Sequence, residues 1–101
     1  MNLSQMNQAR ELKARMDKIQ EELSNTIVEA SSGKGAVKVT ADGQQKIKSI
    51  TISPGVIDPD KAGVLEELVV KAVSEALTKS QKAAASKLKS LTGGLKMPGL
   101  F

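Results

Sequence analysis

Residues 36–53 constrain the fold most, because they have the pattern of two β-strands joined by a tight turn. From Val37 to Asp42, apolar and polar side chains alternate, which is the period of a strand with one buried face. Asp42-Gly43 then interrupts the pattern between two runs rich in β-branched residues. This dipeptide tolerates the positive φ angles of tight turns, so the stretch predicts a β-hairpin.

The return strand carries three isoleucines, Ile47, Ile50 and Ile52, and Ile47 is out of step with the other two. A β-bulge adds one residue to one strand of a pair and thereby shifts the alternation. We therefore expect a bulge near Lys48-Ser49 that places all three isoleucines on the apolar face of the sheet.

A weaker strand precedes the hairpin at residues 26–32 and is followed by the turn Gly33-Lys34-Gly35. Three successive strands joined by short turns favour an antiparallel meander, which we place over residues 26–53. Helical patterns flank this sheet on both sides.

The first helix is predicted at residues 3–25, where apolar residues recur at spacings of three and four. Its length would be about 33 Å, so part of it should extend past a small sheet. A narrow apolar stripe suits a helix pair or coiled coil, and the partner we expect is the same helix of a second subunit. The stripe consists of Leu3, Met6, Ala9, Leu12, Met16, Ile19 and Leu23.

The second helix is predicted at residues 59–92. Asp58-Pro59-Asp60 is typical of a helix start, with Asp58 as the N-cap and proline at the first helical position. The apolar surface of this helix is wider than one stripe, so we expect it to contact the sheet and a second copy of the chain. Residues 93–101 are predicted to be a flexible tail. Residues 1–101 would then form a single α+β domain.

The composition argues against an enzyme. The chain has no cysteine and no histidine, which excludes disulfides, thiolate nucleophiles, imidazole bases and the usual transition-metal ligands. Asp58 and Asp60 are explained by capping, and adjacent carboxylates such as Glu21-Glu22 diverge on a helix rather than flank one substrate bond. We expect no catalytic residues, no cofactor, no metal and no small-molecule substrate.

The sequence also argues against a membrane protein. No window approaches the roughly 20 apolar residues of a transmembrane helix, and the N-terminus has no continuous apolar signal region. The expected location is the cytoplasm, with no membrane partner.

Positive charge is concentrated toward the C-terminus. Residues 78–101 contain five lysines and no acidic residue, whereas residues 58–77 contain two lysines and five acidic residues. Lysines near the end of a helix can simply complement the helix dipole or form a solvated face. They can equally form a surface for an anionic partner.

Several stretches together strongly resemble the YbaB/EbfC family of bacterial nucleoid-associated proteins, over nearly the whole chain. The resemblance implies a homodimeric α+β protein with projecting helices that binds DNA and is associated with the nucleoid. The family has no single fixed DNA-binding motif, so the resemblance assigns a DNA contact to no individual residue. The most specific stretches are GAVKV at 35–39, ITISP at 50–54 and LTGG at 91–94 followed by Pro98-Gly99.

The expected function is therefore binding of double-stranded DNA as a homodimer through basic helical arms. Lysine contacts to phosphates release counterions and give affinity, whereas only Arg10 and Arg15 could provide bidentate base recognition, so we expect low sequence specificity. Phe101 is the only aromatic residue, which disfavours a single-strand stacking platform. The alternative is a protein-interaction scaffold or adaptor without direct nucleic-acid binding. The predicted contacts are Lys79, Lys82, Lys87 and Lys89, assisted by Arg10, Lys13 and Arg15.

Overall fold

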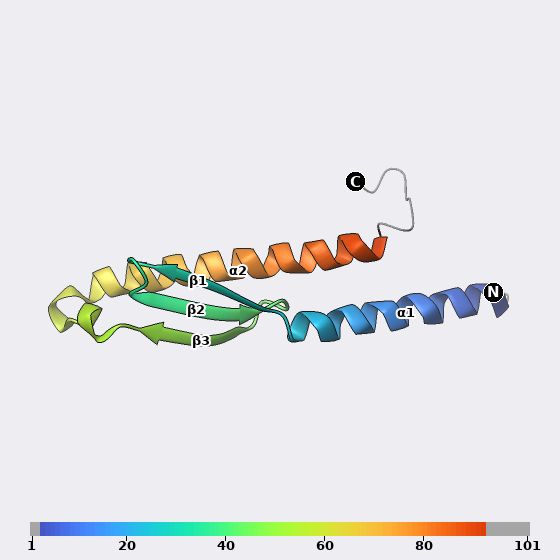
Figure 1. Cartoon of the computed structure of the whole chain (residues 1–101), viewed down its shortest axis with the longest axis horizontal. Helices are drawn as coiled ribbons and strands as arrows, with labels where there is room; N and C mark the ends of the chain where they lie inside the picture. Colours follow the sequence, from blue (N-terminus) through green and yellow to red (C-terminus); the bar gives the residue numbers. More distant parts are fainter. Residues whose placement is uncertain (1–2, 93–101) are drawn as a thin grey trace.

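The chain folds into a three-stranded antiparallel sheet with a long helix before it and another after it (Figure 1). The computed structural model describes residues 3–92, and the tail predicted at 93–101 lies outside them. The predicted α+β fold, a meander between two long helices, is confirmed. The elements are α1 (Leu3–Ser24), β1 (Ile27–Ser32), β2 (Val37–Asp42), β3 (Ile47–Ile52), the short 3-10 turns η1 (Pro54–Val56) and η2 (Pro59–Lys61), and α2 (Ala62–Thr92).

The predicted β-bulge is present in β3. Thr40 of β2 pairs with Ser49, but the next residue, Ala41, pairs with Ile47, so Lys48 is the extra residue. Directly paired residues of an antiparallel sheet share a face, and the bulge thereby brings Ile47 onto the same face as Ala41. The three isoleucines of β3 consequently share one face of the sheet, as expected.

The turn between β2 and β3 uses its glycine differently from our expectation. The positive φ in this turn belongs to Gln45, at 64°, and not to Gly43. The Gly43 N–H donates a hydrogen bond of 2.8 Å to the carbonyl oxygen of Leu23, at the end of α1. A Cβ atom at Gly43 would lie 2.8 Å from Leu23 Cδ2 and 2.9 Å from that oxygen. The turn was predicted correctly for a wrong reason, because glycine is required here by the close approach of α1.

Asp42 stabilises the same turn from the end of β2. Its side chain is only 1% exposed, and its Oδ1 accepts hydrogen bonds from the N–H groups of Gln44 (2.8 Å) and Lys46 (3.1 Å). The Lys48 ammonium lies 3.6 Å from Oδ2. Burial raises the pKa of Asp42, but the two backbone donors and the Lys48 charge outweigh burial, so its pKa lies below the usual value.

The turn also connects both helices. Ser80 of α2 is fully buried, and its Oγ accepts a 2.9 Å hydrogen bond from the Gln45 N–H. The Gln44 side-chain amide donates to the carbonyl oxygen of Gln20 in α1, at 3.0 Å. We call this meeting point of α1, the β2–β3 turn and α2 the junction.

The core lies between the sheet and the first half of α2. Two alanines of α2, Ala72 and Ala76, are fully buried, and their small side chains let the helix backbone approach the sheet closely. The Ser32 hydroxyl at the end of β1 donates to the Leu68 carbonyl oxygen at 2.6 Å, which also ties the strand to α2. The core cluster comprises Ala30, Val37, Val39, Ala41, Ala72 and Ala76.

The edge strand β3 is not fully covered by α2, which packs on β1 and β2. On its apolar face, Ile47 is 38% and Ile50 is 45% exposed. Nearby, Ile52 and the first turns of α2 line a mostly apolar groove of about 510 Å³. Val70, at the rim of this groove, is 63% exposed. The apolar face predicted for the sheet therefore continues beyond what one chain covers.

The start of α2 follows the predicted capping signal. Asp58 precedes the 3-10 turn η2, and its Oδ1 accepts a 2.9 Å hydrogen bond from the Asp60 N–H. Proline occupies the first position of that turn, where a missing N–H costs no hydrogen bond. The α-helical hydrogen bonding begins at Ala62, three residues after the predicted start.

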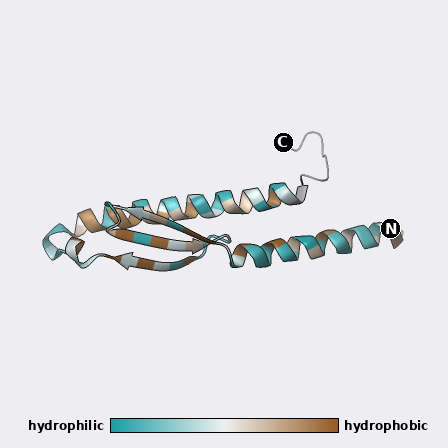
Figure 2. Ribbon diagram, in the orientation of Figure 1, coloured by the Kyte–Doolittle hydropathy of each residue, from teal (hydrophilic) through white to brown (hydrophobic). Residues whose placement is uncertain are grey.

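The molecule is elongated, with extents of 68 × 25 × 18 Å, because α1 projects away from the sheet (Figure 1). Of its apolar stripe only Ile19 and Leu23 are buried, whereas Leu3, Met6 and Leu12 are exposed. Figure 2 shows the same division by hydropathy, with hydrophobic residues frequent in the sheet and the first half of α2, and hydrophilic residues prevailing in α1.

Candidate nucleic-acid interface

Six of the seven predicted contacts lie on α1 or on the part of α2 that extends beyond the sheet (Figure 1). We call α1 together with residues 81–92 of α2 the arm. The chain directions of its helices are opposite, and an ion pair of 3.3 Å between Lys87 Nζ and Glu22 Oε2 links them. The arm joins the sheet at the junction, where Ser80 and Gly43 fix both helices to the β2–β3 turn.

The four lysines predicted as contacts on α2 fall into three different environments. Lys79 lies beside the sheet, where its ammonium donates to the Glu29 carbonyl oxygen at 2.7 Å and lies 3.8 Å from the Glu75 carboxylate. Lys87 turns toward α1 and its acidic partner. Lys82 and Lys89 are exposed, and their spacing of seven residues puts them on one side of the helix. Only these last two form a shared outward surface.

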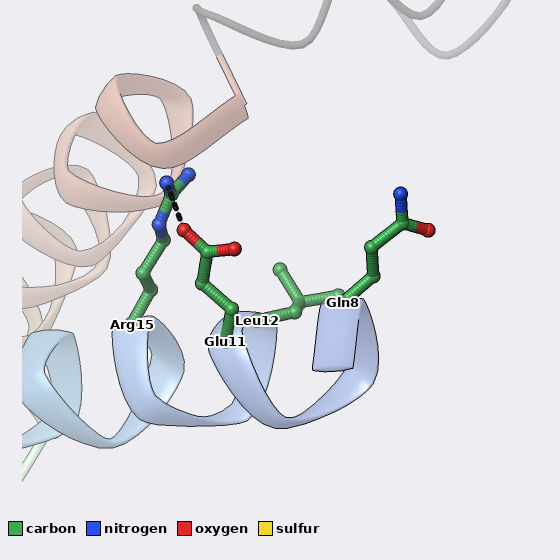
Figure 3. A pocket seen from close by; sticks show the side chains of 4 residues that line it. All are labelled: Gln8, Glu11, Leu12 and Arg15. Atoms are coloured by element: carbon green, nitrogen blue, oxygen red, sulfur yellow. Dashed lines mark hydrogen bonds and ion pairs between the residues drawn. The ribbon is translucent and has the colours of Figure 1, made fainter. Parts of the chain in front are cut away.

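The three predicted contacts on α1 are all exposed. Arg15 pairs with Glu11, one turn earlier, at 2.9 Å (Figure 3). Arg10 and Lys13, three residues apart, are neighbours on the helix surface. Within residues 3–92, neither of them has a carboxylate within ion-pairing distance. Both can meet an anion without first breaking such a pair.

The arm has two adjoining hollows that share Arg15. The first, of about 400 Å³, lies along α1 and is lined by Gln8, Glu11, Leu12 and Arg15, with the last turns of α2 beside it in Figure 3. The second, of about 220 Å³, lies between the two helices. Its lining residues are Arg15, Lys18, Ile19, Glu22, Lys87 and Ser90.

The second hollow includes residues that the sequence analysis did not select. Lys18 and Ser90 were not predicted, whereas Arg15 and Lys87 were predicted but not expected to meet. A sequence signal existed for Lys87, because it continues the inward-facing series of Ala76 and Ser80 at helical spacing. No comparable signal identifies Lys18, since its place in the hollow depends on how α1 lies against α2.

Among residues 3–92 there is no group of three or more carboxylates that could hold a metal ion. Neither α1 nor the part of α2 that the structure describes has an apolar stretch long enough to cross a membrane. The chemistry that the arm offers is attraction of anions by ammonium and guanidinium groups.

Sequence comparison identifies the family. The YbaB/EbfC DNA-binding family matches residues 1–95. A protein of Chloroflexus aurantiacus named as nucleoid-associated is 45% identical over 102 aligned residues, covering all of both chains. Another of that name, from Ruminiclostridium cellulolyticum, is 43% identical over 97 residues, covering 95% of this chain and 84% of the relative.

The fold is found among solved structures as well. An uncharacterized protein of Helicobacter pylori matches with a TM-score of 0.67 and 21% identity, covering 94% of this chain and 97% of that chain. The resemblance seen in the sequence motifs is thus confirmed by the family match, by relatives of similar length and by the shared fold. This chain belongs to the YbaB/EbfC DNA-binding family, whose members are non-enzymatic nucleoid-associated proteins.

Proposed function

We propose that the protein binds double-stranded DNA as a homodimer through its arms, mainly by phosphate contacts and with low sequence specificity. One observation carries the proposal: after Glu75, α2 has four lysines and no carboxylate, and it runs beyond the sheet beside α1. A basic helix that extends clear of the folded core can approach a duplex without displacing packed elements.

The nature of the cations supports phosphate contact over base reading. Duplex DNA carries about one charge per 1.7 Å, and each neutralised phosphate releases counterions. Lysine is a flexible point charge that suits this role, whereas base recognition favours the fork of arginine. Lys79 can take part although one of its three donors already binds Glu29, since an ammonium carries two more. The proposed contacts are Arg10, Lys13, Arg15, Lys79, Lys82, Lys87 and Lys89.

The uncovered apolar face supports a second copy of the chain as the partner in the dimer. Ile47 and Ile50 on β3 continue into the 510 Å³ groove beside the first turns of α2, and Glu66 is the one charged residue among those that line it. A two-fold dimer uses the same patch on both subunits, so an apolar patch can cover its own copy. Two arms per dimer would raise the overall affinity for one duplex through effective concentration.

The test is duplex affinity measured against salt concentration. We expect the double variant Lys82→Gln, Lys89→Gln to bind more weakly to every duplex sequence. The slope of log affinity against log salt should fall by about 1.8 per protomer, at about 0.9 for each lost phosphate contact. Lys79 is left unchanged because it also ties α2 to β1.

The matched control is Lys38→Gln, Lys61→Gln, which removes the same charge from exposed residues on β2 and η2, away from the arm. An arm variant that behaves like this control would contradict the proposed surface. Absence of duplex binding by the unaltered protein in dilute salt would favour the alternative, a protein-interaction scaffold.

A further inference from the structure

The cleft between the two helices of the arm brings three cations together. Arg15 and Lys18 come from α1 and Lys87 from α2, and all three line the 220 Å³ hollow. Glu22 is the one carboxylate among its described lining residues, so the lining carries two net positive charges. Arg15 and Lys87 already have carboxylate partners, Glu11 at 2.9 Å and Glu22 at 3.3 Å, which relieve part of the repulsion between the three cations, and a further anion between the helices would relieve more of it.

We infer that this cleft binds a phosphate group and that Glu22 competes with the phosphate for Lys87. This inference rests on the proposed function and deepens it, because it identifies one site on the arm where the DNA backbone would be held by both helices. It adds Lys18 and Ser90 to the binding residues.

The donors in the cleft suit a phosphate. The guanidinium of Arg15 offers several N–H donors in a planar fork, the two lysine ammonium groups supply compact charge, and the Ser90 hydroxyl can donate one more hydrogen bond. The volume of about 220 Å³ is several times the roughly 30 Å³ share of one water molecule, so a group of several heavy atoms fits. A ligand held there contacts α1 and α2 at once.

Glu22 acts as a built-in competitor. Its carboxylate lies 3.3 Å from Lys87 Nζ, and both side chains are partly exposed, at 42% and 45%. An arriving phosphate must replace this contact to use the full charge of Lys87. Exposed ion pairs are weak, so exchange of one anion for another at Lys87 is easy.

The experiment measures the affinity for a short duplex of the unaltered protein and of Glu22→Gln. Because the carboxylate is removed and its shape is kept, we expect affinity to rise roughly two- to fivefold per arm, the range set by one exposed ion pair. The matched control is Glu67→Gln, an exposed residue of α2 at the sheet end, which should change affinity by less than about twofold.

A double-mutant cycle separates competition at Lys87 from general charge effects. In a Lys87→Gln background, Glu22→Gln should lose most of its gain, because the contact it frees no longer exists. Lys18→Gln should weaken binding, whereas Lys61→Gln should not. If Glu22→Gln gives the same gain with and without Lys87, or the same gain as Glu67→Gln, the inference is overturned.

The phosphate could belong to DNA or to a small anion, and inorganic pyrophosphate distinguishes the two sources. Calorimetric binding of pyrophosphate that strengthens in Glu22→Gln and weakens in Lys18→Gln would indicate a site open to free phosphates. If these two substitutions change duplex affinity but not pyrophosphate binding, the site is one for phosphates of the DNA backbone. Both outcomes support a phosphate site in the cleft. If neither pyrophosphate binding nor duplex affinity responds to the two substitutions, the inference is overturned. A protein that binds pyrophosphate in this way but ignores duplex DNA would refute the proposed function while leaving the cleft standing.

Discussion

Asp42 shows how much one residue does at the junction. It is the one charged residue in the described part of the chain that is buried, and its carboxylate accepts from two backbone N–H groups of the turn that it begins. Without this carboxylate, the N–H groups of Gln44 and Lys46 would lose these hydrogen bonds. The side chain thus fixes the β2–β3 turn, and this turn holds both helices of the arm.

The lowered pKa of Asp42 predicts acid sensitivity. In the folded protein its pKa lies below that of the unfolded chain, about 3.9, so the unfolded state binds more protons in acid. The stabilisation is complete above the unfolded pKa and is lost as pH falls through the folded pKa. We expect Asp42→Asn to lower the free energy of unfolding at pH 7, and we expect the difference from the unaltered protein to shrink in acid.

Urea unfolding at a series of pH values measures this difference. Asp17→Asn, at an exposed position of α1, is the matched control and should keep the stability of the unaltered protein at pH 7. A difference between Asp42→Asn and the unaltered protein that stays constant from pH 7 to pH 3 would contradict the role assigned to the carboxylate.

At the scale of elements, the sequence predicted what depends on local pattern. Alternation, the Asp-Gly turn and the Asp58 cap correctly identified the strands, the hairpin and the approach to α2, because each rests on neighbouring residues. A second subunit as the partner of the projecting part of α1 stays a prediction. Near its C-terminal end α1 lies beside α2 of the same chain, with Ile19 and Leu23 buried, and this contact was not predicted. An apolar stripe on a helix indicates that the helix packs against something, but it does not identify the partner.

Gly43 connects α1 to the sheet, and its replacement should loosen that connection. We expect Gly43→Ala to cost about 1–3 kcal/mol in the free energy of unfolding, the range for an added methyl group in a filled space. The new Cβ would meet the Leu23 carbonyl oxygen at 2.9 Å, and this backbone atom cannot rotate away. Chemical denaturation of purified variants measures the cost.

Gly63→Ala serves as the comparison, because a Cβ there meets no atom within 4 Å. Gly63 lies in the first turn of α2, where alanine is the better helix former, so its replacement should leave stability equal or raise it by up to about 1 kcal/mol. Equal effects of the two substitutions would show that the close approach of α1 is not what requires glycine at position 43.

At the scale of the whole molecule, the sequence indicated the positive charge of the helices but not the contact between α1 and α2. Lys79, Lys87 and Arg15 were predicted as contacts from charge alone, yet each also lies near an acidic partner or backbone oxygen of its own chain. The Lys87–Glu22 pair depends on the distance between two helices, which no local pattern contains. The Arg15–Glu11 and Lys79–Glu75 pairs join residues four apart on one helix, a spacing that the sequence does contain. The exposed apolar face of β3 likewise becomes visible only once α2 is seen to cover two of three strands.

This uncovered face carries the final prediction, which concerns assembly. We expect Ile50→Lys to convert the proposed dimer into a monomer in sedimentation velocity, because a buried ammonium at a subunit contact would lack a counterion. Ile50 is 45% exposed in the single chain, so lysine there should leave the fold intact by circular dichroism. Duplex affinity should fall roughly 10²-fold or more, since the two arms would no longer be tethered.

Ile27→Lys is the control: Ile27 is 58% exposed and alternates with the inward-facing Val28, so it lies on the other face of the sheet. An Ile50→Lys protein that still sediments as two subunits, or an Ile27→Lys protein that dissociates, would place the dimer contact elsewhere.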